Sequence, residues 1–455
     1  MARAHAVVMG AGPAGLLAAR ALAETFERVT VLERDPLPID FEFRGRPQDR
    51  AFETLQPTAA AAMEELDPGL LQALEEGGAP VLRRLDQLQM EMAGHLMCRS
   101  GDLSEPLHRP GYPFLMDRLR ARRPARVEIR HSTTAVDLLV ADGRVVGVAA
   151  EAPQGLAEFP ADLVVDAAGH AGHAALWLSR WGLPAPELDS QNVDLRCVCL
   201  VVDRFDRPTG VEAVYSSDAH PGRPWGVHAG QVERNRWVLV VFGYRGNHPP
   251  QERDGLLAFV SGVLPEAWLR VFSESASVDL PTCQEFPTSV RRRFDLVRGL
   301  PAGLIAIGDA WCGPNPFYCQ GMTLAAQAAV TLRDVARTGD DADLAARYLA
   351  ATAPAVNRAW QLASGSDRAY PQVSGMAPNK QGEHALHVIL AAAERDPAVL
   401  NALLQVSYGV AGRNMTAVSM MAKTSKVGRA AKRDAKHQSK DAKHQAKRDR
   451  RQAVG

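Results

Sequence analysis

A glycine-rich loop and an acidic residue have the types and spacing needed to bind a dinucleotide. Gly10, Gly12 and Gly15 form the pattern Gly-x-Gly-x-x-Gly, and Glu33 follows 18 residues after the last glycine. Such glycines permit a tight turn, close approach of the backbone to a pyrophosphate, and close packing of a helix on a strand. A carboxylate at the end of the next strand can accept hydrogen bonds from ribose hydroxyls. The sequence therefore predicts a dinucleotide site.

The residues around this loop predict the elements that hold it. Residues 5–9 are apolar and predict a strand, and residues 16–26 are alanine-rich and predict a helix. Residues 29–32 predict a second strand that ends at Glu33. A strand, a glycine loop, a helix and a strand in this order open a dinucleotide-binding fold, in which the helix N-terminus faces the phosphates.

A second acidic residue ends another apolar run. Residues 304–307 lead into Gly308 and Asp309, and an alanine-rich helix is predicted to begin about a dozen residues later, near Gly321 and Met322. Backbone N–H groups at the start of a helix favour negative charge on a ligand. We therefore regard this stretch as a second candidate for ligand binding.

Further strands are predicted in both halves of the chain. Residues 126–130, 135–140 and 145–150 are β-type runs, with a hairpin turn at 141–144. Residues 163–165 are another apolar strand that leads into an acid-glycine turn at 166–169.

Residues 191–270 differ in character, because β-type runs such as 196–202 and 237–242 predominate there. A second, sheet-based domain is predicted for this segment. The run 304–307 then returns the chain to the first domain, and residues 330–421 are mainly helical in pattern. The predicted fold class is α/β: a discontinuous Rossmann-like domain with an inserted β-sheet domain and C-terminal helices.

The charge of the chain is balanced but unevenly distributed. There are 52 basic and 52 acidic residues, yet residues 422–455 hold 12 Lys or Arg against 3 Asp or Glu. This basic tail repeats a polar seven-residue unit with almost no apolar residues. It is therefore predicted to be solvated and to form no hydrophobic core of its own. The alternative is electrostatic contact with an acidic carrier protein, nucleic acid or an anionic membrane. Residues 1–379 contain no lysine, which excludes a catalytic lysine there.

The cysteines and the N-terminus indicate a compartment. The six cysteines have neither CxxC pairs nor metal-ligand spacing, which predicts isolated thiols in a reducing cytosol and no metal site. The first residues run directly into a strand, without the apolar stretch of a signal peptide. No apolar run approaches the about 20 residues of a membrane span. We expect a soluble, cytoplasmic protein.

Three motifs in this order resemble those of the group A-like FAD-dependent monooxygenases, which have the para-hydroxybenzoate hydroxylase fold. The first is residues 10–15 with Glu33 and Arg34, the second is DLVVDAAG at 162–169, and the third is GDAWCGPNPFYCQGMT at 308–323. The nucleotide-binding domain is then an FAD-binding domain. Its expected parts are 1–75, 98–170 and 285–365, with a substrate domain at 171–284 that includes 76–97, a helical region at 366–421 and the tail at 422–455.

Within this family the chain is similar to one branch. RGRPQ at 44–48 and the segments 237–250 and 360–371 resemble the bacterial epoxidases of polyether and terpenoid biosynthesis, and more distantly squalene monooxygenase. The resemblance covers residues 5–410. It implies insertion of one atom of O2 into a lipophilic small molecule, an intermediate of secondary metabolism, by epoxidation or hydroxylation through a flavin C4a-hydroperoxide.

The resemblance also implies cofactors, partners and site residues. NADPH or NADH would supply electrons, either directly or through a partner flavin reductase. The implied FAD-binding residues are Gly10, Gly12, Pro13, Ala14, Gly15, Glu33, Arg34, Val136, Asp309, Pro316, Gly321 and Met322. The residues implied near the flavin and the substrate are Arg46, Phe317, Tyr318 and Cys319.

The chain departs from the family pattern close to the expected flavin. Cys319 stands where the family usually has glycine, Tyr112 where it has arginine, and His170 where arginine is common. Ala51 and Glu53 stand where the family tends to have histidines.

Two other functions stay open at this point. One is a flavin-dependent reductase or dehydrogenase of a polyprenyl-type substrate, and the other is a non-catalytic FAD-binding or ligand-binding protein. A flavin-dependent halogenase of this fold is excluded, because it needs a catalytic lysine and a WxWxIP motif that residues 1–379 lack. For a phenol hydroxylation, His228 and Tyr244 on the inserted sheet are candidate bases.

Overall fold

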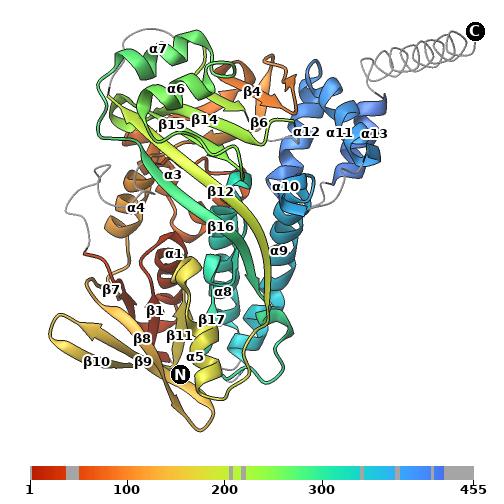
Figure 1. Ribbon diagram of the computed structural model, residues 1–455. Coiled ribbons are helices and arrows are strands. Elements are labelled where there is room, and N and C mark those ends of the chain that lie inside the picture. The colour runs from red at the N-terminus through yellow and green to blue at the C-terminus, as the bar shows by residue number, and fades with distance from the viewer. Residues whose placement is uncertain are drawn as a thin grey trace, which may run out of the picture.

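The computed structural model describes residues 3–36, 51–203, 209–216, 222–338, 343–374, 380–410 and 414–424 (Figure 1). One region is built on a parallel sheet and contains the N-terminus, and the other is built on a larger, mainly antiparallel sheet. Two long strands connect these regions, and helices from the C-terminal part of the chain run along one side.

A five-stranded parallel sheet in the order β17-β11-β1-β2-β7 forms the centre of the first region. Its strands are β1 (Arg3–Met9), β2 (Phe26–Leu32), β7 (Val127–Arg130), β11 (Leu163–Asp166) and β17 (Leu304–Ala306). The inner strands are apolar because helices cover the faces of a parallel sheet. The pairing of β17 with β11 confirms that the chain returns to this domain after the insertion.

Helices pack around this sheet and around one another. They are α1 (Pro13–Leu22), α2 (Pro57–Leu66), α3 (Leu70–Glu76), α4 (Tyr112–Ala121), α5 (Ala174–Arg180), α8 (Gly321–Arg337) and α9 (Leu344–Asp367). The helix predicted for residues 16–26 ends earlier than expected, at Leu22. The reason is that Phe26 already belongs to β2, where it pairs with Arg3 and is buried.

Two smaller sheets are also present, one beside the parallel sheet and one beside β4 of the inserted sheet. The strands β8 (Thr134–Ala141), β9 (Arg144–Ala152) and β10 (Gly155–Pro160) are antiparallel. The predicted hairpin turn is confirmed: Asp142 and Gly143 both have positive φ, as a two-residue hairpin turn requires. The edge strand β10 was not predicted, because its exposed residues lack an apolar run. The other sheet pairs β3 (Val81–Arg84) with β6 (Asp102–His108).

The inserted sheet has eight strands in the order β18-β16-β12-β15-β14-β13-β4-β5. Their bounds are β4 (Leu88–Met92), β5 (His95–Leu96), β12 (Leu188–Val202), β13 (Ala213–Ser216), β14 (Trp225–Val232), β15 (Arg236–Gly243), β16 (Thr282–Arg292) and β18 (Cys312–Gly313). The helices α6 (Arg253–Val260) and α7 (Glu266–Glu274) cover one face. The strands β12 and β16 extend from this sheet toward the first region (Figure 1).

Alternation along the strands gives this sheet two different faces. Val198, Leu200 and Val241 point toward α6 and α7. Cys199 and Val240 point the other way, into a cluster that includes residues of the loop before α8. The inserted sheet therefore faces that loop with apolar side chains.

The last helices are α10 (Pro371–Ser374), α11 (Lys380–Ala393), α12 (Pro397–Ser407) and α13 (Met415–Thr424). Leu390 of α11 and Val399 of α12 pack on the side of the inserted sheet formed by residues such as Leu88. The mainly helical pattern predicted for this part of the chain is confirmed where the structure describes it, and residues 425–455 of the basic tail lie outside that part. Among the described residues, no helix combines the length and the hydropathy needed to cross a membrane.

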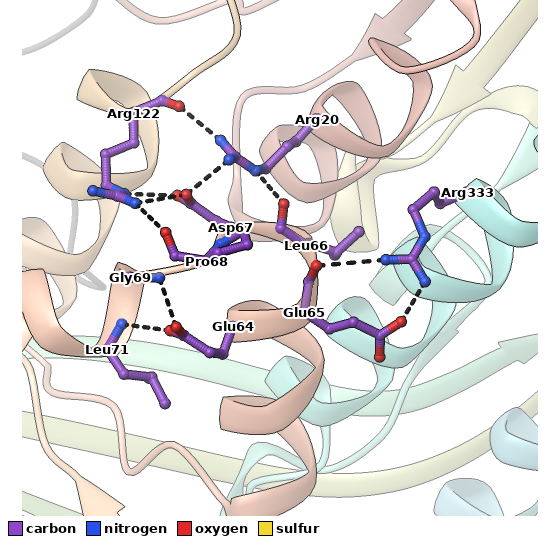
Figure 2. A network of polar contacts seen from close by, with 10 residues as sticks. All are labelled: Arg20, Glu64, Glu65, Leu66, Asp67, Pro68, Gly69, Leu71, Arg122 and Arg333. Carbon is purple, nitrogen blue, oxygen red and sulfur yellow. Dashed lines mark hydrogen bonds and ion pairs between the residues drawn. The ribbon is translucent and has the colours of Figure 1, made fainter.

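A buried carboxylate joins three helices of the first region (Figure 2). Asp67, at the end of α2, is only 2% exposed. Its carboxylate accepts hydrogen bonds from Arg122, at the end of α4, at 2.8 and 2.9 Å, and pairs with Arg20 of α1 at 2.7 Å. Arg333 of α8 meets Glu65 of α2 beside this cluster. These ion pairs fix the helices that carry the glycine loop and the start of α8.

We predict that Asp67→Ala lowers the free energy of unfolding by about 3 kcal/mol, since removing one partner leaves two clustered arginines without their carboxylate. Asp86→Ala is the matched control, because Asp86 pairs with Arg84 on the exposed surface. That variant should leave the free energy of unfolding almost unchanged, because solvent screens an exposed ion pair. Urea unfolding followed by circular dichroism measures both, and equal losses would contradict the assignment.

Candidate functional site

The loop between β1 and α1 is packed too closely for side chains at two of its glycines. A Cβ at Gly15 would lie 1.9 Å from the carbonyl oxygen of Gly10, and a Cβ at Gly10 would lie 2.6 Å from that of Ala167. Gly10 also has a φ of 103°, which L side chains rarely adopt. At Gly12, by contrast, nothing lies within 4 Å of the Cβ position. This opening in front of α1 is where a phosphate can approach the helix N-terminus.

Glu33 follows β2 and braces the glycine loop. Its carboxylate accepts hydrogen bonds from the backbone N–H groups of Ala11 at 2.8 Å and Asp35 at 3.1 Å. The side chain is buried against the protein, but it lines a cavity together with Arg34. This is the position that the sequence predicted for an acceptor of ribose hydrogen bonds.

A cavity of 460 Å³ begins at the glycine loop, passes the ends of β2 and β11, and reaches the start of α8. Ligands of open α/β sheets bind at the carboxyl ends of the strands, and this cavity lies there. The predicted cofactor residues that line it are Gly10, Gly12, Pro13, Ala14, Glu33, Arg34, Asp309, Gly321 and Met322.

The other predicted residues do not line this cavity. Gly15 packs behind the loop, and β8 presents Thr134 and Ala135 where Val136 was predicted. Four further predicted site residues lie in the loop before α8 and do not line the cavity, although the start of α8 does: Pro316, Phe317, Tyr318 and Cys319. Arg46 lies outside the described residues. Sequence reasoning missed lining residues such as His173 and Trp177, because single residues of α5 and its approach carry no motif.

Asp309 faces the cavity and is held from behind. Nδ1 of His170 lies 3.2 Å from its carboxylate, and this contact raises the pKa of His170. The guanidinium of Arg292 donates to the carbonyl oxygens of Asp309, Ala310 and His170 at 3.1–3.2 Å. Arg292 therefore connects the turn after β11 with the turn after β17. His170 places a titratable group beside Asp309, the acid expected to bind the cofactor.

Glu53 lines the same cavity as Asp309. Burial raises the pKa of Glu53 to about 7, and the negative charge of Asp309 adds to the effect. The sequence marked this residue only as a departure from the family. Its position gives the cavity a carboxyl group that titrates near neutral pH.

Cys319 adopts a backbone conformation that favours glycine. Its φ is 52°, in the left-handed region, which costs a residue with a side chain about 1–2 kcal/mol. The family's usual glycine at this position therefore has a conformational reason. Burial raises the pKa of the Cys319 thiol to about 12, so it stays protonated at neutral pH and is not a nucleophile.

A buried acid fixes the loop before α8. Oδ1 of Asp367, at the end of α9, accepts hydrogen bonds from the Tyr244 hydroxyl at 2.7 Å, the Asn315 amide at 2.9 Å and the Tyr318 hydroxyl at 3.0 Å. Asn315 in turn accepts from the backbone N–H of Phe317 at 3.0 Å. Burial raises the pKa of Asp367 to about 6, so the group is mainly ionised at neutral pH. Three donors on one carboxylate oxygen hold the loop against the inserted sheet.

The two candidate bases differ in what they can do. Tyr244 donates its hydroxyl proton to Asp367, and burial raises its pKa well above the usual value. A hydroxyl held protonated in this way does not favour the role of base for which Tyr244 was a candidate. His228 is buried between Tyr215 and Phe242, with ring centroids at 4.9 Å from each. Burial lowers its pKa to about 3, so its imidazole is neutral.

Comparison with known proteins places the chain in a family. It is 33% identical to protein Rv3254 of Mycobacterium tuberculosis strain H37Rv over 376 residues, which is 79% of each chain. The chain belongs to the protein Rv3254 family. Within it, residues 53–195 of this chain match the family described as "FAD binding domain". This match supports FAD as the ligand of the cavity.

More distant similarities are found in sequence and in structure. Digeranylgeranylglycerophospholipid reductase 1 of Methanopyrus kandleri is 27% identical over 332 residues, 70% of this chain and 76% of that protein. A flavoprotein/dehydrogenase from Cytophaga hutchinsonii superposes with a TM-score of 0.63 at 16% identity, over 89% of this chain and 92% of that one. The tetrameric form of 2-methyl-3-hydroxypyridine-5-carboxylic acid oxygenase superposes with a TM-score of 0.59 at 18% identity, over 81% and 92%.

The residues of the cavity fit FAD. Gly12 leaves the N-terminus of α1 open, and the first turn of that helix has no acidic residue to repel a pyrophosphate. Glu33 and Asp309 both line the cavity, where their carboxylates could accept from hydroxyl groups of the ribose and the ribityl chain. The N-terminus of α8, at Gly321 and Met322, presents backbone N–H groups to the far end of the cavity.

We predict opposite behaviour for two alanine variants of the loop. Gly15→Ala forces the loop to shift and should lower the free energy of unfolding by about 3 kcal/mol or more. Gly12→Ala meets open space, so its stability should stay within about 0.5 kcal/mol of wild type while FAD affinity falls. Chemical unfolding without FAD and titration with FAD separate the two effects. A stable Gly15→Ala protein would contradict the packing described.

We predict that Glu53→Gln becomes more stable relative to wild type as pH rises. A carboxyl whose pKa is raised from 4.5 to about 7 in the folded protein contributes stability below its unfolded pKa, and that contribution is lost as pH rises through about 7. The advantage of the variant should therefore grow by about 1 kcal/mol between pH 6 and pH 8. Urea unfolding of the FAD-stripped protein measures it, with Glu158→Gln on the exposed strand β10 as control. A constant difference would show that Glu53 titrates normally.

Proposed function

We propose that this protein is an FAD-dependent monooxygenase that inserts one oxygen atom of O2 into a lipophilic small molecule. The observation that carries the proposal is the position of the cavity, which runs from the dinucleotide loop to the N-terminus of α8, next to the apolar face of the inserted sheet. A flavin bound there would have its reactive end at the junction of both regions. Epoxidation or hydroxylation of a secondary-metabolite intermediate is the finer form of this proposal.

The protein's own residues would bind, orient and exclude water. Bound FAD would supply the activation of O2, and the chain would hold it through the glycine loop, Glu33 and Asp309. Phe317, with Cys199 and Val240 of the sheet, would form an apolar chamber for the substrate. Such a chamber excludes water and keeps the substrate close to the reactive end of the cofactor. An alkene needs no protein nucleophile, which agrees with a protonated Cys319 thiol.

Electrons would come from NADPH or NADH, directly or through a partner flavin reductase. The basic residues 422–455 would contact an acidic partner protein in this scheme. We propose a cytoplasmic location, in keeping with the isolated thiols of the described part of the chain.

A second candidate function is reduction of a polyprenyl-type substrate. The observation that favours it is the 27% identity to the digeranylgeranylglycerophospholipid reductase of Methanopyrus kandleri. The same apolar chamber would accept a long hydrocarbon chain, and the reaction would add hydrogen to a double bond without using O2.

We predict that Asp309→Ala loses most of its bound FAD, at least about tenfold in affinity, because a hydrogen bond to the cofactor is removed without a substitute. Asp309→Asn keeps the shape and one acceptor, and should lose less. The flavin absorption of the purified proteins measures occupancy. A variant as yellow as wild type would contradict the role of Asp309.

The reaction class is tested by adding NADPH to the holoprotein in air. Bleaching of the flavin spectrum followed by recovery with oxygen uptake supports a monooxygenase that uses NADPH directly. If NADPH does nothing, the same assay is repeated with a flavin reductase. Reduction of the substrate without incorporation of oxygen from labelled O2 supports the second candidate. A flavin that no electron donor reduces supports a non-catalytic binding protein.

A further inference from the structure

Arg109 is a buried cation that lacks a carboxylate partner among the described residues. It lies between β6 and α4 and is 0% exposed. Its Nε donates to the Tyr215 hydroxyl at 2.8 Å, and Nη1 makes long contacts to the carbonyl oxygens of Glu212 at 3.5 Å and Gln231 at 3.3 Å. Its Nη2 has no hydrogen-bond partner in the described part of the chain. A buried charge of this kind is costly unless something compensates it.

The inserted sheet makes room for this guanidinium. A Cβ at Gly230 of β14 would lie 2.0 Å from Arg109 Nη1 and Nη2, so a side chain there would displace the guanidinium from this position. The Tyr215 hydroxyl, which accepts from Arg109, lies 2.6 Å from the Thr54 hydroxyl and can donate to it. The position of the charge is therefore specified by several residues.

A second unpartnered polar group lies beside this charge. Nε2 of His228 has no hydrogen-bond partner among the described residues. Strand register places Tyr215, His228, Val240 and Cys199 in one row across β13, β14, β15 and β12. His228 also stacks near Phe317 of the loop before α8, with ring centroids 6.3 Å apart. The row is thus polar at the Arg109 end and apolar at the other.

An aromatic ring covers the charge. The Arg109 Cζ atom lies 4.4 Å from the ring centroid of Phe52, which presents its electron-rich face to the cation. Phe52 is only half-buried, and the next residue, Glu53, lines the FAD cavity. The ring therefore occupies the side of Arg109 from which a ligand in the chamber would arrive.

We propose that Arg109, together with His228 and Tyr215, binds an anionic oxygen of the substrate, a carboxylate or a phenolate, once Phe52 turns aside. This inference rests on the proposed function, because it assumes that the substrate occupies the chamber below the inserted sheet. It narrows the substrate class to molecules with an apolar body and one acidic oxygen. The anionic oxygen of a bound substrate would compensate the buried charge of Arg109. Without substrate, the cation–π contact with Phe52 would stabilise that charge.

The test is calorimetric titration of the FAD-loaded full-length protein with benzoate, 2-naphthoate and biphenyl-4-carboxylate, each against its neutral primary amide. We expect at least one carboxylate to bind about tenfold or more tightly than its amide, as charge-assisted hydrogen bonds imply. Arg109→Met should abolish this preference. The matched control is Arg118→Met: Arg118 also lies over a phenylalanine ring, Phe114 at 5.2 Å, but pairs with Asp117. That variant should keep the preference.

A purely structural role for Arg109 predicts different results. If Arg109 serves binding, replacing a buried charge by methionine should leave the thermal midpoint equal or higher. Phe52→Ala, which keeps Arg109, should bind the carboxylate several-fold more tightly because the cover is gone. The proposal is overturned if the wild-type protein binds no carboxylate more tightly than its amide, which includes the case in which it binds neither. It is also overturned if Arg109→Met keeps the preference for the carboxylate, or if Phe52→Ala leaves carboxylate binding unchanged. Calorimetry needs no turnover, so carboxylate preference without oxygen uptake would sink the proposed function and leave this subsite standing.

Discussion

Three turns from distant parts of the sequence pack so closely that glycines are needed where they meet, and the site depends on this packing. A Cβ at Gly10 would meet the carbonyl of Ala167, and a Cβ at Gly308 would lie 2.7 Å from the Cβ of Ala14. The glycine loop, the turn after β11 and the turn after β17 therefore lie as close as their chains permit. This closeness places Glu33 and Asp309 on one cavity. Side chains at these glycines would separate the turns and widen the site.

The reactive end of the cavity is positioned from the opposite direction, by the C-terminal helices. Asp367 at the end of α9 holds Tyr244 of the inserted domain together with Asn315 and Tyr318 of the loop before α8. One carboxylate thus joins three parts of the chain. The cost of burying it is partly offset by three donors, which explains why its pKa is raised only to about 6. A loop that carries a strained Cys319 needs this anchoring, because nothing in its own sequence favours the left-handed conformation.

The sequence predicted the motif residues of the cavity, but not most of the other residues that line it. The glycine loop, Glu33, Asp309 and the start of α8 were recognisable because backbone geometry permits few residue types there, and such constraints leave motifs. The segments 237–250, 308–323 and 360–371 each carry a recognisable pattern, yet the sequence does not predict their meeting at Asp367, since no local pattern encodes a contact between remote segments. Val136 was misplaced by one or two residues because neighbouring strand positions look alike.

For the same reason, the sequence does not predict that Arg109 and His228 lie close together. One follows β6 and the other lies on β14, and only the three-dimensional packing at Gly230 brings the guanidinium onto the sheet. An isolated arginine in a sequence without lysine before residue 380 attracts no attention, since arginine is the ordinary cation of this chain.

The charges around the two ligands differ in a way that separates their binding. Acidic groups line the FAD cavity, including Glu33, Glu53 and Asp309, although the cofactor's pyrophosphate is itself anionic. Binding there would rely mainly on backbone N–H groups and helix N-termini, which attract anions without a formal charge, together with Arg34 as a cation of the lining. Beside the inserted sheet, by contrast, lies the buried cation Arg109, whose Nη2 has no hydrogen-bond partner in the described part of the chain, next to a neutral His228. If an acidic substrate binds there as proposed, Arg109 would attract its anionic oxygen and the acidic groups of the cavity would repel it, so charge would orient its apolar body toward the flavin.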